Sequence, residues 1–224
     1  MKKLILIIIA IAFLLASCTK HDGPTTQCNC NFTDFRYYHG EQVELSEIQD
    51  KYILIGIDTT YTDNQIKNFI SSIKEFDKKY VYTIHTSSQY KFKEIPLRFK
   101  FPKTCEEITQ IISNLEKNEI VAYAHYTMKI DHCLNLIGEQ MGDLCVISYG
   151  SNFYVKTYDE NNLFDLNQII LETNTEFVKQ VMPQWFELRA TKKSKGDALK
   201  MANYFYETGL FEDSEPGMSR YPVE

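Results

Sequence analysis

The amino-acid sequence predicts an α+β fold of two tandem ferredoxin-like domains, each with the element order βαββαβ, after an N-terminal signal and a short tether. Hydrophobic residues make up 44% and charged residues 24% of the 224 residues, a mixture typical of globular proteins. Apolar residues recur with a period of two in some segments and with helical spacing in others. The order of these patterns is repeated in the second half of the chain. The predicted divisions are 1–17 for the signal, 18–34 for the tether, 35–142 for the first domain and 143–224 for the second.

The first predicted domain opens with a short apolar run bounded by turn-forming residues, which indicates a strand. Thr62 and Gln65 have the spacing of a capping box ahead of an apolar helical face, and Thr104 and Glu107 repeat that spacing ahead of a second one. The predicted strands are 52–57, 80–86, 95–101 and 120–128, and the predicted helical faces are 66–73 and 108–115.

The second predicted domain has the same order of elements. Pro183 and Gln184 form a turn between two strands, and Gly209 stands where the end of a helix favours a left-handed residue. The predicted strands are 153–158, 176–182, 185–190 and 210–215, and the predicted helices are 163–172 and a second one opened by 194–197. Each domain is expected to have two helices on one face of a four-stranded sheet, with the other face open.

The N-terminus has the pattern of a secretion signal. Two lysines precede an apolar run at 4–16, which is too short to span a membrane and has the length of a signal core. The run ends in Leu15-Ala16-Ser17-Cys18, which resembles the lipobox of bacterial lipoproteins, whose cysteine is acylated. Cys18 is therefore the predicted lipid-attachment residue, with palmitate among the expected acyl chains. The alternative is an ordinary signal peptide with a chance cysteine.

Five cysteines remain beyond Cys18, an odd number for a disulfide framework outside the cytoplasm. Cys28 and Cys30 are too close in sequence to pair comfortably, whereas a bridge between Cys133 and Cys145 is possible and unproven. A metal cluster of His125, His132 and Cys133 lacks zinc-site spacing, so no metal and no cofactor is predicted.

The charge balance excludes one class of partner. The formal net charge is −6, and because both charges in the first 17 residues are lysines, the remainder of the chain is near −8. Nucleic-acid binders need a net basic surface, so no nucleic-acid partner is predicted. Asp58 ends an apolar strand as a catalytic aspartate would, but neither it nor His39 is followed by the residues that a serine-protease motif requires. No catalytic constellation is present, and the protein is predicted not to be an enzyme.

Four segments resemble the N-terminal pro-region of bacterial subtilisin-family serine peptidases. They are 182–188 (MPQWFEL), 196–211 (GDALKMANYFYETGLF), 214–216 (SEP) and, near the start, 35–41 (FRYYHGE). The resemblance is strong over about 184–216 and diffuse in the middle of the chain. It implies a ferredoxin-like module that assists folding of a protease and inhibits it, with the open sheet face on the catalytic domain and the C-terminal tail in the substrate groove. The chain stops at Glu224 without a protease domain, which implies a free-standing module acting in trans or the relic of a truncated gene.

Alternation along 185–190 predicts which side chains face a partner. Phe186, Leu188 and Ala190 are expected to face the helices, so Trp185 points to the open face. The predicted protein-binding residues are Tyr154, Tyr158, Trp185, Glu187, Arg189, Phe211, Glu215 and Pro216, with Lys156 beside them. The alternative is that this face packs on the first domain.

Together these patterns favour a non-catalytic lipoprotein of the bacterial cell envelope, anchored by lipid to the outer membrane. The leading hypothesis is a module that binds a subtilisin-like serine protease, either inhibiting it or assisting its folding. The alternative is a surface adhesion protein, or a lipoprotein that binds carbohydrate or peptide, as the lipid signal and the many tyrosines suggest.

Overall fold

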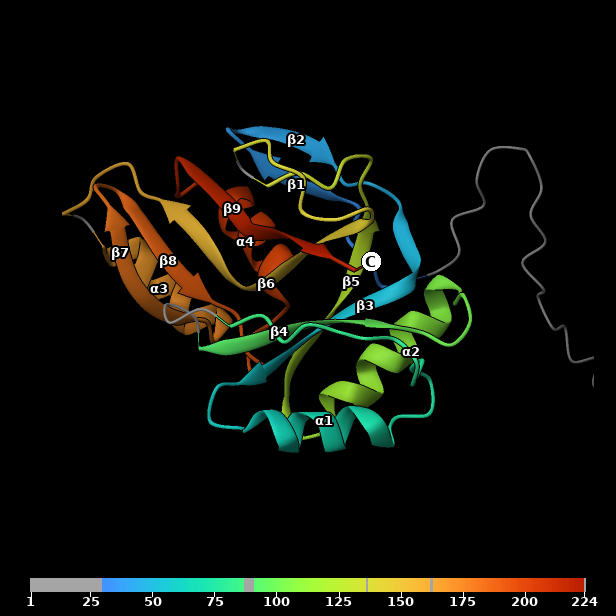
Figure 1. Cartoon of the computed structure of the whole chain (residues 1–224). Coiled ribbons are helices and arrows are strands. Elements are labelled where there is room, and N and C mark those ends of the chain that lie inside the picture. The colour runs from blue at the N-terminus through green and yellow to red at the C-terminus, as the bar shows by residue number, and fades with distance from the viewer. Residues whose placement is uncertain (1–29, 87–90, 136, 162, 224) are drawn as a thin grey trace, which may run out of the picture.

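Four helices pack on a seven-stranded antiparallel sheet, and a separate two-stranded hairpin lies beside it (Figure 1). The computed structural model describes residues 30–86, 91–135, 137–161 and 163–223, and these counts refer to that part of the chain. The helices are α1 (Asp63–Ser72), α2 (Cys105–Glu116), α3 (Phe164–Thr173) and α4 (Ala198–Glu207). The strands are β1 (Phe35–Tyr38), β2 (Glu41–Glu44), β3 (Ile48–Asp58), β4 (Phe92–Arg98), β5 (Val121–Lys129), β6 (Cys145–Lys156), β7 (Glu176–Met182), β8 (Trp185–Arg189) and β9 (Asp213–Pro222). The predicted α+β class is confirmed.

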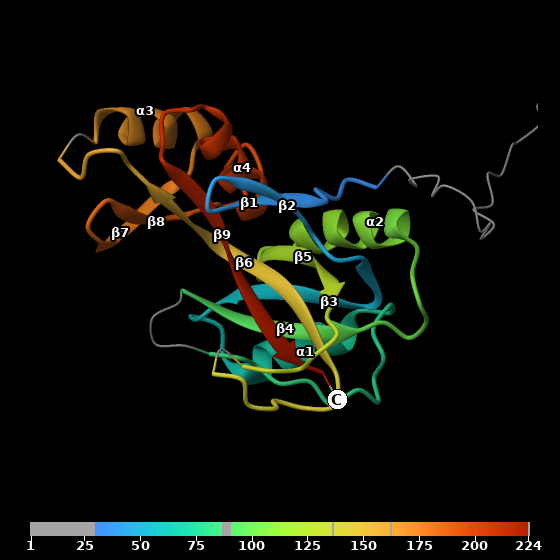
Figure 2. The same ribbon diagram turned by 90° about the horizontal axis from the view of Figure 1, so that it is seen from above.

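Strand β6 joins the two halves of the sheet. The strand order is β4-β3-β5-β6-β8-β7, with β9 paired to the other side of β6. The N-terminal end of β6 pairs with β5 at residues 146–147, its C-terminal half pairs with β8 at residues 152–156, and β9 follows it over most of its length. In Figure 2, β6 and β9 run side by side across β3, β4 and β5. The two halves of the chain are therefore linked by continuous main-chain pairing.

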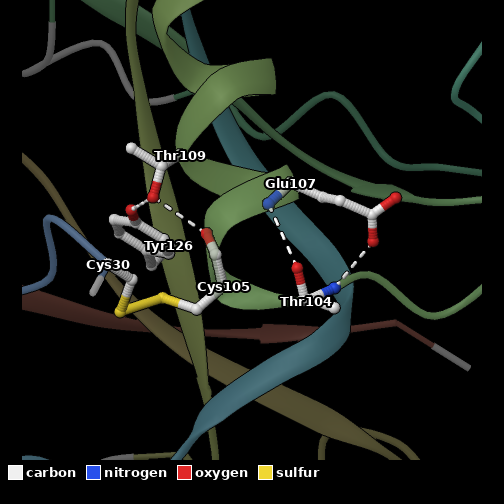
Figure 3. Close-up of a disulfide and its surroundings, with 6 residues drawn as sticks. All are labelled: Cys30, Thr104, Cys105, Glu107, Thr109 and Tyr126. Carbon is white, nitrogen blue, oxygen red and sulfur yellow. Dashed lines mark hydrogen bonds between the residues drawn. A yellow bond between two sulfur atoms is a disulfide. The ribbon is translucent and has the colours of Figure 1, made fainter. Parts of the chain in front are cut away.

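Local sequence signals start the first two helices where the sequence predicts. The Thr62 side chain and Gln65 form a complete capping box at α1, and Thr104 and Glu107 form another at α2. At α2 the Glu107 amide donates to the Thr104 hydroxyl over 3.3 Å, and the Thr104 amide donates to the Glu107 carboxylate over 2.9 Å (Figure 3). Each box satisfies amides that would otherwise be unpaired at the helix start.

Within the described part of the chain, two disulfides join segments that are distant in sequence. One joins Cys133 to Cys145, the pairing that the sequence left open, and the other joins Cys30 to the first residue of α2, Cys105 (Figure 3). The Cys30–Cys105 bridge shows that the predicted tether, 18–34, is too long at its C-terminal end. Phe32 is half-buried and its ring lies 5.2 Å from that of Tyr126. Cys30 is thus bonded to the first half, Phe32 packs against the clusters of both halves, and Asn31 accepts a hydrogen bond of 3.1 Å from Lys200 of α4, so residues 30–32 are part of the folded structure. The predicted tether residues before Cys30, and Cys18, lie outside the described residues.

Three apolar clusters form the core. The first lies between α1, α2 and the sheet strands β3, β4 and β5, and the second lies between α3, α4 and the strands β6 and β8. The third covers the helix-free face of β3 and β5 with side chains from the ends of β6 and β9. Its buried members are Tyr52, Leu54, Tyr80, Tyr123, Val146, Tyr221 and Val223. The predicted open face of the first half is therefore covered by the second half.

A glycine and a carboxylate make this close packing possible. The Tyr123 ring lies directly on Gly56, where an added Cβ would be 2.1 Å from the ring carbon Cζ. The Tyr123 hydroxyl donates to Glu94 over 2.6 Å, and the Tyr221 hydroxyl donates to the other oxygen of that carboxylate over 2.7 Å. Burial and the Glu94 charge raise the pKa of Tyr123 well above its ordinary value, which keeps this hydroxyl a donor.

Several segments differ from the predicted elements: the β1–β2 hairpin was not predicted, β3 begins at Ile48 instead of residue 52, and β4 covers Phe92–Arg98 instead of 95–101. Residues 80–86 form a single bridged pair, His85 with Glu94, because Tyr80 and Tyr82 turn into the third cluster instead of continuing a ladder. Strand β6 begins at Cys145, earlier than predicted. Strand β9 covers Asp213–Pro222 instead of the predicted 210–215, so the expectation of a C-terminal tail available to a partner is wrong, and Tyr221 is buried. Among the described residues no helix is both long and apolar enough to cross a membrane.

Candidate binding site

The helix-free face of the second half carries the single tryptophan. Phe186 and Leu188 of β8 are buried under α3 and α4, and the alternate residues Trp185 and Glu187 lie on the opposite face, as the alternation predicts. Ala190, just beyond the strand, is also in the helix-side cluster. The predicted orientation of this strand is therefore confirmed.

The face forms a groove between β7 and the β1–β2 hairpin, which we call the tryptophan groove. Its lining residues are Tyr38, His39, Tyr154, Lys179, Val181, Met182, Trp185, Glu187 and Glu215. Tyr38 ends β1 and His39 is in the following turn, and the other lining residues come from β6, β7, β8 and β9. Met182 is 57% exposed and Tyr38 is 41% exposed, so apolar surface is accessible at both sides of the groove.

The hairpin reaches this face because it packs on the second half, although the predicted boundary placed residue 35 in the first. The Asn203 side chain donates to the Phe35 carbonyl over 3.0 Å, and the Tyr206 hydroxyl donates to the Gly40 carbonyl over 2.9 Å. The turn residues His39 and Gly40 have φ of 51° and 78°. Positive φ at both positions is what a type I′ hairpin turn requires, and glycine satisfies it without steric cost.

Glu187 is buried in the floor of the groove. It is 4% exposed, and its carboxylate accepts a hydrogen bond of 2.5 Å from the Asn152 amide and lies 3.5 Å from the Lys179 ammonium. The same Asn152 accepts a hydrogen bond of 3.1 Å from Arg189. These contacts compensate the burial of the charge, and they fix the strand that carries Trp185.

The other predicted binding residues lie in four different places. Arg189 lies over the Phe92 ring at 5.6 Å, so it faces the junction with the first half. Tyr158 is 64% exposed but lies outside the lining of the groove. Phe211 is 2% exposed and packs in the helix-side core, which removes its side chain from the predicted surface. Pro216 is also buried, and it lines a second crevice with Tyr154 and Glu215.

A histidine and two carboxylates meet at the hairpin side of the groove. His39 Nδ1 lies 3.9 Å from Asp213 Oδ2 and 3.9 Å from Glu215 Oε1. Burial and the neighbouring Asp213 raise the pKa of Glu215, against the opposing effects of the His39 amide and Arg36. The sequence analysis assigned no role to this cluster. The available signal was the alternation of Asp213 and Glu215 on one strand, which does not reveal a histidine 174 positions away.

The residues weighed as a metal or catalytic site do not assemble into one. Cys133 is in a disulfide and His132 is exposed. His125 is 4% exposed, stacked between the rings of Tyr123 and Tyr149, with Nδ1 2.8 Å from the Tyr149 carbonyl oxygen. Asp58 accepts a hydrogen bond of 2.9 Å from the Thr60 amide, the usual role of aspartate in a turn.

No protein-family model and no curated protein matches this chain. A search of solved structures gives the crystal structure of the acetolactate synthase small subunit from Thermotoga maritima. The match covers 78% of this chain and 97% of that chain, at 9% sequence identity and a TM-score of 0.27.

Proposed function

We propose that this protein is a non-catalytic lipoprotein of the cell envelope that binds a protein partner at the tryptophan groove. The partner proposed is a subtilisin-type serine protease, as the resemblance over about 184–216 implies. The observation that carries the binding proposal is the position of Trp185, half-buried in an accessible groove between exposed Met182 and Tyr38. Tryptophan, tyrosine and methionine are enriched in the cores of protein interfaces.

The fold proposal is two ferredoxin-like units in tandem. In the second half the strands β6, β7, β8 and β9 follow the order βαββαβ and lie as β9-β6-β8-β7, with α3 and α4 on one face. In the first half β5, β3 and β4 lie in the corresponding order, and the segment that is bridged to β4 at His85, and at Phe76 to Phe99 just beyond β4, takes the place of the missing strand. This arrangement supports a prodomain-like unit in the second half.

Strand β7 adds a way to hold an extended segment of the partner. It pairs only with β8 and ends the sheet order among the described residues, so its outer side has no strand partner there. Val181 and Met182 are exposed on it. Peptides bind sheet edges by adding a strand, with neighbouring pockets reading alternate side chains. Trp185 and Tyr154 provide such a pocket beside β7.

Because β9 occupies residues 213–222 as a sheet strand, we do not propose that a C-terminal tail enters the partner's substrate groove. Binding through the sheet face and the β7 edge does not need that tail. Two measurements in the presence of the protein distinguish the two roles. A fall in the activity of the protease would indicate inhibition, and a faster or more complete refolding of the protease would indicate assistance in folding.

The cellular location is proposed from the sequence. Cys18 carries the lipid, and the mature protein is held on the outer membrane. Cys18→Ala should release the protein from the membrane fraction, because each buried methylene of an acyl chain contributes about 0.8 kcal/mol to anchoring. An unlipidated variant that still sediments with membranes would contradict this assignment.

The test of the groove is the affinity for a subtilisin-type protease with a blocked active site, measured by calorimetry on the full chain. Trp185→Ala should weaken binding by about 30-fold, the equivalent of roughly 2 kcal/mol for an interface hot spot. Leu171→Ala is the matched control, because Leu171 is 79% exposed on α3, away from the groove. Equal affinities for the wild type and Trp185→Ala would refute the assignment of the groove.

A glycan or an unrelated peptide that shifts the Trp185 fluorescence, with no protease binding, would favour the alternative lipoprotein function. The aromatic residues and buried Glu187 in the groove are compatible with such a ligand. Since Trp185 is the single tryptophan, its emission reports this groove alone.

A further inference from the structure

Three potential metal-ligating side chains meet beside the β1–β2 turn. The ligand atoms of His39, Asp213 and Glu215 all lie within 4.8 Å of one another. They come from two elements, since His39 is in the β1–β2 turn and both carboxylates project from β9. Residues two apart on a strand share one face, which places the carboxylates side by side.

The two carboxylates lack a matching positive charge at contact distance. Asp213 has 8% of its side chain exposed and Glu215 has 18%. Among the described residues, their ion pairs are with His39, which is charged only when protonated. The guanidinium of Arg36 acts on Glu215 from farther away while it stacks over the Tyr38 ring at 4.7 Å. Burying two like charges together is costly unless a cation compensates them.

One oxygen of the buried Asp213 is available for such a cation. Its Oδ1 accepts a hydrogen bond of 2.8 Å from the Ser214 amide. Its Oδ2 faces the imidazole and accepts no hydrogen bond within the part of the chain that the structure describes. This oxygen belongs to a side chain that is 8% exposed, and it lies 3.9 Å from a histidine nitrogen and within 4.8 Å of a second carboxylate, an arrangement that a metal ion can complete.

We propose that His39, Asp213 and Glu215 bind a divalent transition-metal cation, with Zn²⁺ the ion that this donor set fits. Imidazole nitrogen with carboxylate oxygen suits zinc and its neighbours, whereas Ca²⁺ and Mg²⁺ take all-oxygen sites. Tetrahedral bonds of about 2.0–2.2 Å place ligand atoms about 3.3 Å apart. His39 Nδ1 therefore has to approach each carboxylate by about 0.6 Å, and the two carboxylate oxygens, which lie within 4.8 Å of each other, have to approach by up to about 1.5 Å. The His39 side chain is 70% exposed, so solvent surrounds most of it.

Three protein ligands leave one position of a tetrahedral ion open. Because His39 and Glu215 also line the tryptophan groove, that position is near the groove and available to water or to a ligand in it. The bound ion would also join the hairpin turn to β9. Metal binding is measured without any protein partner, so its outcome is separate from the outcome for the proposed function.

The experiment is a titration of the full chain with Zn²⁺ by calorimetry, with Mg²⁺ as the comparison ion. We expect one equivalent of Zn²⁺ to bind in preference to Mg²⁺. His39→Ala and the isosteric Glu215→Gln should each lower the Zn²⁺ affinity by at least about tenfold, since even outer-sphere substitutions have effects of that size. His132→Ala is the matched control, because His132 is exposed and lies outside the cluster.

Co²⁺ provides a second measurement that locates the ion. Bound at this site it should give the visible absorption of a four-coordinate ion and quench the Trp185 emission, and Zn²⁺ should reverse both changes. The proposal is overturned if Zn²⁺ does not bind, if Mg²⁺ binds as tightly, or if His39→Ala binds like the wild type. It is also overturned if Glu215→Gln, shown by its melting temperature to be folded, keeps the full affinity.

Discussion

The Cys30–Cys105 bridge should contribute more to stability than the Cys133–Cys145 bridge. The two pairs are separated by 75 and 12 residues in sequence. A crosslink lowers the entropy of the unfolded chain by an amount that grows with the logarithm of the closed loop. At 25 °C this relation gives about 4.5 kcal/mol for the longer loop and about 2.8 kcal/mol for the shorter one. Removing the longer bridge should therefore cost about 1.6 kcal/mol more.

The assay is urea unfolding of the full chain without reductant, followed by far-ultraviolet circular dichroism. One variant replaces both Cys30 and Cys105 by serine, and the matched variant replaces both Cys133 and Cys145. The first variant should have the lower free energy of unfolding. The dependence of that free energy on urea concentration, the m-value, should identify any change in the compactness of the unfolded chain. If the second variant lost as much stability or more, loop entropy would not be the main effect of these bridges.

Two further perturbations test the junction and the carboxylate pair. Tyr221→Phe removes a hydrogen bond to the Glu94 carboxylate and should cost about 1.5–3 kcal/mol of unfolding free energy, and an unchanged urea midpoint would contradict a role for this contact. Glu215→Gln should raise the melting temperature in metal-free buffer, and more at pH 7 than at pH 4. The reason is that a raised carboxyl pKa in the folded state makes stability fall as the pH rises from the unfolded value of 4.5 through the folded pKa. An equal gain at both pH values would show that the charge of Glu215 does not act this way.

The sequence was sufficient to predict those features of the fold that depend on residues within a single helix or strand. The two threonine capping boxes predict the starts of α1 and α2, and both form. Alternation in β8 predicts that Phe186 and Leu188 face the helices, because one face of that strand is wholly apolar. Such patterns depend on residues a few positions apart, so a single sequence contains them.

The sequence did not reveal features that depend on distant segments. The sequence predicts a last strand only over 210–215, whereas β9 continues through Pro216, Gly217 and Pro222, which disfavour strands, because β6 pairs with it on both sides of a register shift. Nothing near Cys30 specifies Cys105, and nothing near His39 specifies the carboxylates of β9. Each of these pairings is set by the packing of the hairpin and the N-terminal segment on the folded sheet.

The N-terminal segment and β9 together connect the groove to the rest of the molecule. Cys30 is bonded to α2 in the first half, and fewer than ten residues later the β1–β2 hairpin contacts α4 and β9 in the second half. Strand β9 lines the groove with Glu215 and, farther along, places Tyr221 on the Glu94 carboxylate of β4. A displacement of the hairpin would therefore move one wall of the groove, and a displacement of β9 would disturb the buried junction. The position of Trp185 relative to the hairpin thus depends on contacts from both halves, although the residues that line the groove belong to the hairpin and the second half.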